Sequence, residues 1–211
     1  MSADAVTRVL VVRHGETAWN AELRIQGHTD IALNPRGQWQ AQQLVRALAD
    51  ETLHAVYSSD LQRAHDTARP AAEAAGLAVQ HHPGLRERGF GHFEGLTFAE
   101  IDNRWPEDAR RWRQREPGFA PGDGEALTGF YARCVDAAAA LAGRHRGQTI
   151  LLVSHGGVLD CLYRAATGAA LDAPRSWALG NAAVNRLLHT DAGFTLVGWN
   201  DTRHLDAEPV A

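Results

Sequence analysis

Two histidines that each precede glycine stand close after two strongly apolar runs of the chain. His14 follows the run 9–12, with Arg13 between them, and His155 follows the run 150–153, with a serine between them. Such runs are typical of buried parallel strands, and ligands of open parallel sheets bind beyond the carboxyl ends of the strands. We therefore expect both imidazoles and the Arg13 guanidinium at one sheet edge, where glycine lets an anionic ligand approach the backbone.

Two further side chains are expected at the same edge. Arg63 falls in the first turn of the helix predicted after a strand at 55–57, and a helix N-terminus itself favours anions. Glu87 follows the strand predicted at 77–81. The edge would then hold two imidazoles, two guanidinium groups and one carboxyl group.

These residue types divide into roles that suit a phosphomonoester. The guanidinium groups of Arg13 and Arg63 can each bind two phosphate oxygens. They also disfavour protonation of a neighbouring imidazole, so a neutral histidine is expected to attack phosphorus. A polyanionic substrate disfavours ionisation of Glu87, which is expected to donate a proton to the leaving oxygen. The predicted mechanism is two in-line transfers through a phosphohistidine, with no metal and no cofactor.

Strand-like and helical patterns alternate along the chain. They predict an α/β fold of three layers, with a mainly parallel central sheet, helices on both faces and an antiparallel edge strand. The strands are expected at 8–12, 55–57, 77–81 and 149–153, with an edge hairpin of 183–189 and 194–199, and the helices at 35–49, 61–75, 125–141 and 157–166.

The remaining segments are expected to be less regular. The run 83–95 is rich in glycine and polar residues and predicts an irregular loop, and 201–211 predicts a loosely held tail. The segment 96–122, with its Arg/Trp-rich stretch 104–115, is interpreted as a helical excursion or lid over the site. We take 1–211 as a single domain.

Composition excludes several classes of partner. The formal net charge is −4, and aromatic residues are not interleaved with basic runs, so nucleic acid is not expected to bind. No apolar window reaches the roughly 18 residues that a membrane span needs, and the first residues lack a leader pattern. Cys134 and Cys161 lack the spacing of a metal or redox motif and are expected as reduced, buried thiols. We expect a cytoplasmic protein whose partners are a small phosphorylated substrate and inorganic phosphate, with a homodimer left open.

With these motifs the chain resembles the histidine phosphatase superfamily, the phosphoglycerate-mutase-like group, over nearly its whole length. Arg13-His14-Gly15 resembles the family motif in which the histidine becomes phosphorylated, which implies that His14 is the nucleophile. Arg63 resembles the second phosphate-binding arginine, and Glu87 stands where the family keeps its proton donor. The resemblance also implies that the phosphate pocket includes Asn20, Gln26, Gly27, His155 and Gly156.

Plain structural roles remain as alternatives for several of these residues. Glu87 is flanked by Arg86 and Arg88 and could form a surface ion pair, while Asn20 and Gln26 could stabilise turns. The arginines of 104–115 are more typical of a solvated face than of a substrate clamp. A metal site is not expected, because His65, His81, His82 and His92 match no common ligand spacing.

Three hypotheses about the function remain to be compared. Motifs for cysteine-based and aspartate-based phosphatases, C-x5-R and D-x-D, are missing. The short chain and the run 86–95 are similar to the phosphatase branch of the family, so a phosphomonoesterase is preferred. A cofactor-dependent phosphoglycerate mutase is the alternative, and a non-catalytic phosphate-binding scaffold is the third. Sugar phosphates, phosphoglycerates and nucleotide-like phosphates all stay open as substrates.

Overall fold

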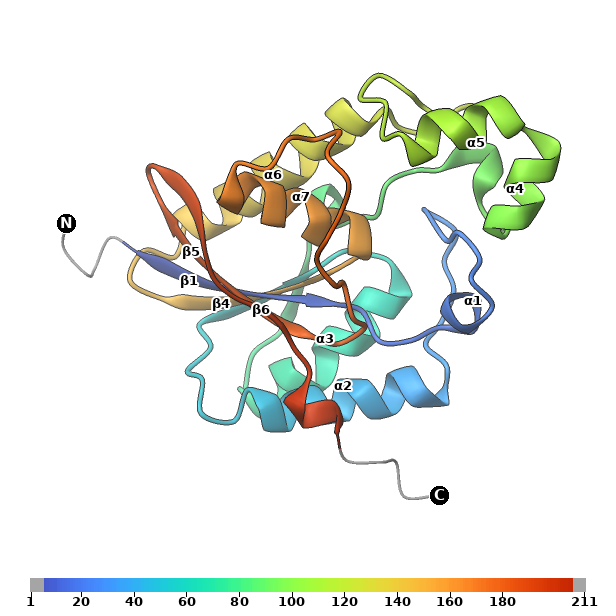
Figure 1. Cartoon of the computed structure of the whole chain (residues 1–211). Coiled ribbons are helices and arrows are strands. Elements are labelled where there is room, and N and C mark those ends of the chain that lie inside the picture. Colours follow the sequence, from blue (N-terminus) through green and yellow to red (C-terminus); the bar gives the residue numbers. More distant parts are fainter. Residues whose placement is uncertain (1–5, 207–211) are drawn as a thin grey trace.

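The computed structural model describes residues 6–206 as one six-stranded sheet with helices on both faces (Figure 1). The strands are β1 Thr7–Arg13, β2 Ala55–Ser58, β3 Val79–His81, β4 Thr149–Ser154, β5 Val184–Thr190 and β6 Gly193–Asp201. The helices are α1 Ala18–Ala21, α2 Pro35–Ala47, α3 Gln62–Ala74, α4 Phe98–Arg104, α5 Pro106–Arg113, α6 Leu127–Gly143 and α7 Gly156–Thr167. Short 3-10 turns are η2 Pro83–Leu85, η3 Gly91–Phe93 and η4 Arg203–Leu205. The predicted α/β class is confirmed.

The strand order brings the two histidine motifs together. The order is β3-β2-β4-β1-β5-β6, and the first four strands in it run parallel to one another. The predicted hairpin supplies the antiparallel edge, because β5 runs antiparallel to β1 and β6 antiparallel to β5. In the register of β1 with β4, Arg13 pairs with Ser154. His14 and His155 therefore leave the sheet side by side.

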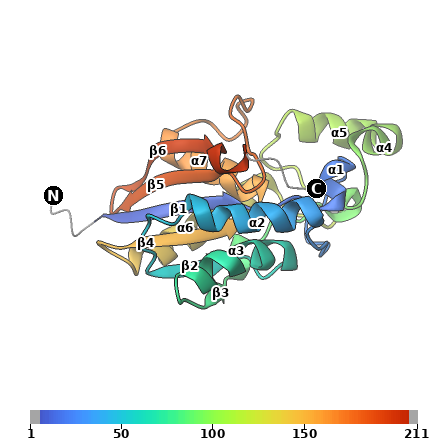
Figure 2. The same ribbon diagram turned by 90° about the horizontal axis from the view of Figure 1, so that it is seen from below.

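Strand β1 is buried on both faces because its side chains alternate between two helical layers. Val9 and Val11 pack in the cluster formed with α6 and α7, and each is fully buried. Leu10 and Val12 point the other way, into the cluster formed with α2 and α3. Figure 2, seen from below, shows α2 and α3 lying across that second face. The sheet is thus held rigidly where its strand ends form the site.

Helix boundaries follow the local sequence. The Asn34 side chain accepts a hydrogen bond from the Gly37 N–H at 2.8 Å, and Pro35 occupies the first turn of α2, as the sequence predicts. Helix α7 begins directly after His155 and ends at Gly168, whose φ of 71° is the left-handed value that glycine adopts readily.

Helices α6 and α7 carry the two cysteines. Cys134 and Cys161 are both free and fully buried, as predicted. Burial raises the pKa of the Cys134 thiol, which keeps it protonated. Among residues 6–206, no helix is both long enough and apolar enough to cross a lipid bilayer.

The segment 96–122 stands apart from the sheet at one end of the molecule and contains α4 and α5 (Figure 1). Its residues Ile101, Ala109 and Phe119 form a small hydrophobic core together with Phe93 of the preceding run. The preceding run 83–95 was expected to be wholly irregular, and this is wrong for two turns, η2 and η3. Pro83, the first residue of η2, has the φ value that a tight helical turn requires. That the excursion moves as a lid stays a prediction.

The chain after β6 turns back onto the molecule. Asp201 pairs with Arg186 at 3.1 Å and with Arg203 at 2.7 Å. His204 Nε2, in η4, lies 3.0 Å from the Ala182 carbonyl oxygen. The first part of the expected loose tail, 201–206, is therefore held by these contacts, and 207–211 lie outside the described residues.

Candidate active site

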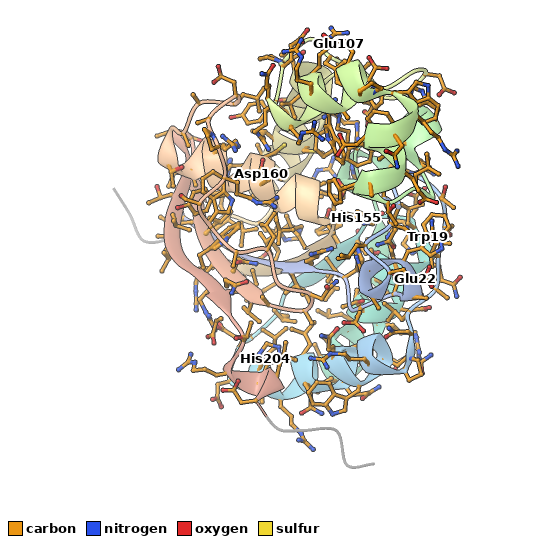
Figure 3. The ribbon with its side chains drawn as sticks, turned by 45° about the vertical axis from the view of Figure 1, so that its right-hand side comes forward. Trp19, Glu22, Glu107, His155, Asp160 and His204 are labelled. Carbon is orange, nitrogen blue, oxygen red and sulfur yellow. The ribbon has the colours of Figure 1, made fainter. Side chains whose placement is uncertain are left out.

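A cavity of about 640 Å³ opens beyond the carboxyl ends of the parallel strands. Eight of the nine predicted site residues line it, namely Arg13, His14, Asn20, Gln26, Gly27, Arg63, Glu87 and Gly156. The ninth, His155, is fully buried and lies against His14, with ring centroids 5.2 Å apart. Figure 3 shows His155 at the start of α7, with Asp160 farther along the same helix.

His14 is held in the form that a nucleophile requires. Its Nδ1 lies 2.7 Å from the Gly15 carbonyl oxygen. Because a carbonyl only accepts hydrogen bonds, Nδ1 carries the proton and Nε2 keeps its lone pair. Burial, with added repulsion from the Arg63 and Arg13 guanidinium groups, holds the pKa of His14 well below its usual value. The ring is therefore neutral, with Nε2 available to attack.

His155 is oriented by a serine that the sequence did not single out. Its Nε2 lies 2.8 Å from Ser59 Oγ, which already accepts the Leu61 N–H at 3.1 Å. In the tautomer in which the serine proton bonds to Nε2, Nδ1 of His155 carries the ring proton. Burial, and repulsion from Arg63, also hold the pKa of His155 well below its usual value.

The two arginines are fixed by backbone carbonyls at their far nitrogens. Arg13 donates from Nη1 to the Leu179 carbonyl at 2.7 Å. Arg63 donates to the carbonyls of Thr29 at 2.9 Å and Gly27 at 2.8 Å. These contacts set the planes of both guanidinium groups.

Six buried side-chain nitrogen or oxygen atoms have no hydrogen-bond partner among residues 6–206, and three of the six are nitrogens of predicted site residues. These three are Arg13 Nε, Arg63 Nε and His155 Nδ1. Leaving one buried donor unpaired costs about 1–3 kcal/mol, so three such donors around one histidine are unusual. The oxygens of a phosphoryl group are acceptors of the kind that such donors require.

Glu87 lies at the wall of the cavity between its own loop and α7. Its Oε1 accepts the Arg88 N–H at 2.9 Å, and its Oε2 accepts the Gly157 N–H at 3.1 Å. The alternative of a surface ion pair with its neighbours does not hold for the described residues. Arg86 pairs instead with Asp60 at 2.6 Å, and Arg88 donates to backbone carbonyls.

Asn20 and Gln26 combine the structural and the binding interpretations. Asn20 Oδ1 accepts the Thr17 N–H at 3.1 Å in the capping box of α1, and Gln26 Oε1 lies 3.0 Å from Thr17 Oγ1. Gln26 NH₂ makes no hydrogen bond to another described residue, and Asn20 NH₂ makes none either. Both side chains thus bring unused donors to the cavity that they line. Gly27, at φ 53°, turns the chain there.

Residues 14–16, which follow β1, are called the nucleophile loop here. Two residues that position this loop were not identified from the sequence. Thr67 Oγ1 accepts the Gly15 N–H at 2.8 Å, and Asn181 donates to the His14 carbonyl at 2.8 Å. Thr67 could have been found, because it lies four residues after Arg63 on the same face of α3. Asn181 precedes β5, far along the chain, and no local pattern connects it with His14.

A histidine that is kept neutral between two arginines, beyond the ends of parallel strands, defines a site for phosphoryl transfer. Within the described part of the chain, no group of three or more His, Cys, Asp or Glu side chains is arranged to hold a metal ion. The chain belongs to the histidine phosphatase superfamily (branch 1), whose family model matches residues 9–202.

Comparison with individual proteins agrees with this family. The chain is 39% identical over 203 residues to "Phosphoglycerate mutase-like protein 4" of Arabidopsis thaliana, covering 94% of this chain and 86% of that protein. It is 37% identical over 205 residues to "Metal-independent phosphoserine phosphatase" of the same plant, covering 96% and 84%. The solved structure of Bacillus stearothermophilus YhfR superposes with a TM-score of 0.89 at 31% identity, covering 95% of this chain and all of that one.

Proposed function

We propose that this protein is a metal-independent phosphomonoesterase for small phosphorylated metabolites, working through a phosphohistidine at His14. The observation that carries the proposal is the set of three unpartnered buried donors around a histidine whose Nε2 lone pair is free. The names of the relatives support phosphomonoester substrates. Two free buried thiols fit a reducing compartment such as the cytoplasm.

The first half of the reaction forms the intermediate. His14 Nε2 attacks phosphorus in line with the ester oxygen, the N–P bond forms and the P–O ester bond breaks. Arg13 and Arg63 bind the nonbridging oxygens, whose charge they stabilise during transfer. Glu87 gives its proton to the leaving oxygen.

The second half of the reaction hydrolyses the intermediate. Water attacks the phosphohistidine and gives a proton to the Glu87 carboxylate, and the N–P bond breaks. Inorganic phosphate and neutral His14 Nε2 result, with Glu87 protonated again. His155 Nδ1–H remains a donor to the phosphoryl oxygens throughout.

The test is to trap the intermediate. Enzyme mixed with a ³²P-labelled phosphomonoester in excess chelator and quenched in alkali, where phosphohistidine survives, should carry label on His14. His14→Asn should carry none, whereas His81→Asn, which changes an exposed histidine, should label normally. Label on another side chain, or turnover by His14→Asn, contradicts the proposal.

The mutase alternative has its own test, because both reactions share the first half. The enzyme is supplied with 3-phosphoglycerate and a trace of bisphosphoglycerate, and both products are followed. Release of free phosphate supports the phosphatase. Rapid formation of 2-phosphoglycerate without free phosphate supports the mutase instead.

The outer part of the cavity bears on the leaving group. Phe98 and Trp112 of the excursion stack at 5.1 Å and form one wall, and Trp177 lies on the lining as well. Arg175 also lines the cavity and has no hydrogen bond or ion pair to the residues that the structure describes. Its charge is close enough to contribute to lowering the pKa of Arg13. An unpaired cation beside apolar rings suits a leaving group with a second anionic group, such as a carboxylate.

A further inference from the structure

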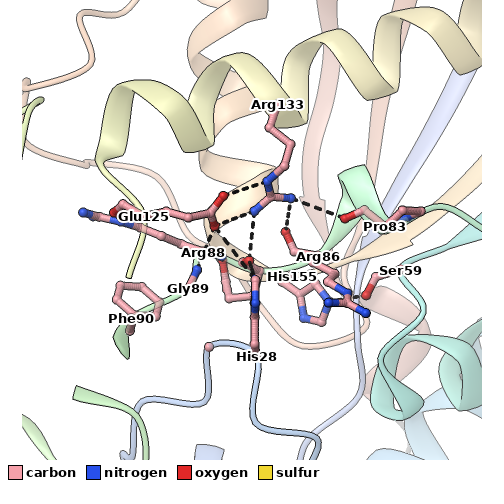
Figure 4. Close-up of polar contacts among 12 residues, drawn as sticks. His28, Ser59, Pro83, Arg86, Arg88, Gly89, Phe90, Glu125, Arg133 and His155 are labelled. Carbon is pink, nitrogen blue, oxygen red and sulfur yellow. Dashed lines mark hydrogen bonds and ion pairs between the residues drawn. The ribbon is translucent and has the colours of Figure 1, made fainter. Parts of the chain in front are cut away.

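The Arg133 side chain uses all five of its N–H groups on one neighbouring carboxylate and on the segment that carries Glu87 (Figure 4). Two N–H groups bind the Glu125 carboxylate, at 2.8 and 2.7 Å. The other three donate to the backbone carbonyls of Gly84 at 3.0 Å, Arg86 at 3.1 Å and Glu87 at 3.1 Å. We call residues 84–89 the acid loop, because Glu87 lies within it.

The backbone of Glu87 is held from two sides. Its carbonyl oxygen accepts from Arg133 and also from His28 Nε2 at 2.8 Å, which uses both of its lone pairs. Two residues farther on, the Gly89 N–H donates to Glu125 Oε2 at 2.8 Å. The acid loop has no strand partner at these positions, so these side chains take the place of the missing ladder.

The same contacts connect the acid loop to the phosphate site. His28 follows Gly27, whose carbonyl orients Arg63. The His28 side chain therefore bonds to the Glu87 carbonyl, while the carbonyl of the preceding residue, Gly27, accepts a hydrogen bond from Arg63. The backbone of Glu87 is thus linked to the segment whose carbonyl orients Arg63.

We infer that Arg133, supported by Glu125, is a positioning residue that sets where Glu87 meets the leaving oxygen. The inference rests on the proposed function, in which Glu87 is the proton donor. Displacement of an acid by about 1 Å can cost a factor of 10² in rate, while phosphate binding by Arg13 and Arg63 does not involve Arg133. Loss of Arg133 should therefore affect proton donation and leave binding nearly intact.

The test compares two substrates that differ in their need for a proton. An alkyl phosphate has a poor leaving group and depends on the acid, whereas the phenolate of p-nitrophenyl phosphate hardly does. Arg133→Met should lower kcat/KM for the alkyl phosphate about tenfold and kcat/KM for p-nitrophenyl phosphate less than about threefold. The parameter kcat/KM is compared because it covers the steps up to departure of the leaving group and not the hydrolysis of the phosphohistidine, which both substrates share. Arg133→Lys, which keeps the charge but not the planar fork, should fall between.

A double-mutant cycle separates positioning from a merely structural role. In a Glu87→Gln background there is no acid left to position, so Arg133→Met should add no further loss for the alkyl phosphate. Arg111→Met serves as a control, because Arg111 also makes a two-bond ion pair, with Glu116, but makes no hydrogen bond to the acid loop among the described residues. Arg111→Met should leave the ratio of kcat/KM for the alkyl phosphate to kcat/KM for p-nitrophenyl phosphate unchanged.

Each contrary outcome has a distinct meaning. Equal slowing of both substrates by Arg133→Met, or additive losses in the Glu87→Gln background, overturns the positioning role while the proposed function stands. A Glu87→Gln enzyme with an unchanged substrate ratio overturns the acid assignment and this inference together. If Arg133→Met does not fold, the two-substrate comparison and the double-mutant cycle with Glu87→Gln are performed with Arg133→Lys instead.

Discussion

The imidazole ring of His14 lies 5.2 Å from that of His155, centroid to centroid, with the ring planes inclined by 57°. The contact follows from sheet register, because the residues before them, Arg13 and Ser154, are paired across neighbouring parallel strands. Two neutral histidines in contact, each beside the same arginines, make a site whose protonation is set by burial. Their partners can be tested one at a time.

Removal of the Ser59 hydroxyl should weaken the role of His155. Ser59→Ala takes away the partner of His155 Nε2, so the ring no longer has a fixed protonated nitrogen. We expect kcat/KM to fall about tenfold, as for other groups that orient a site histidine. Stability should fall by about 1–3 kcal/mol, because the Leu61 N–H loses its buried acceptor as well. Steady-state kinetics and urea unfolding measure both. Ser58→Ala is the neighbouring control, and an equal loss of activity there would argue against this role.

The lowered histidine pKa values predict how stability depends on pH. In the folded protein the pKa values of His14 and His155 lie well below their usual value, whereas in the unfolded chain they are ordinary. From about pH 6.5 downward the unfolded chain binds protons that the folded protein does not, so stability is lost as pH falls, by up to about 1.4 kcal/mol per pH unit per group.

Urea unfolding of His155→Gln measures this slope. Between about pH 7 and about pH 5.5, the variant should lose less stability than the unaltered protein, because one such group is gone. Parallel losses in the two proteins would mean that His155 is not held neutral by the fold.

Gly37 is required by close backbone packing against the nucleophile loop. A Cβ atom at Gly37 would lie 2.1 Å from the Glu16 carbonyl oxygen, and one at Gly15 would lie 2.6 Å from the Gly37 oxygen. Gly37→Ala should therefore destabilise the protein by about 1–3 kcal/mol, as overpacking does. Activity should also fall, because His14 moves with this loop.

A second glycine provides the matched control. Gly129 lies in α6 with no atom within 4 Å of an added Cβ. Gly129→Ala should stabilise the protein by about 0.5–1 kcal/mol through helix propensity alone. Thermal unfolding of the two variants should therefore shift in opposite directions, and shifts of the same sign would contradict the packing argument.

Arg175 should discriminate between leaving groups. Arg175→Gln removes a cation that lines the cavity and is largely exposed, so folding should not change. KM for O-phosphoserine and 3-phosphoglycerate, whose leaving groups carry a carboxylate, should rise about fivefold, the loss of one exposed charge contact. KM for p-nitrophenyl phosphate should stay within about twofold. A uniform rise for all three would place Arg175 in general anion binding.

Sequence reasoning reached those features that depend on strand ends and spacing. His14, His155, Arg63 and Glu87 could be placed at one edge because apolar runs mark parallel strands, and the parallel rule then fixes where their ends meet. The structure brings all four together. The sequence did not reveal Ser59, Asn181 or Arg133 as positioning residues, because each acts on a residue far away in the chain. The two 3-10 turns within 83–95 were not predicted, because proline and glycine are common both in irregular loops and in tight turns.

Strand β1 lies in the middle of the sheet although it is made first. Its two neighbours are β4 and β5, Arg13 Nη1 is held by the Leu179 carbonyl, and the Arg13 carbonyl accepts the Ala182 N–H. A chain still on the ribosome therefore carries His14 long before it can form the phosphate cradle. Hydrolytic capacity should arise abruptly, once the chain through β5 has emerged, and fragments ending earlier should be inert toward phosphoesters.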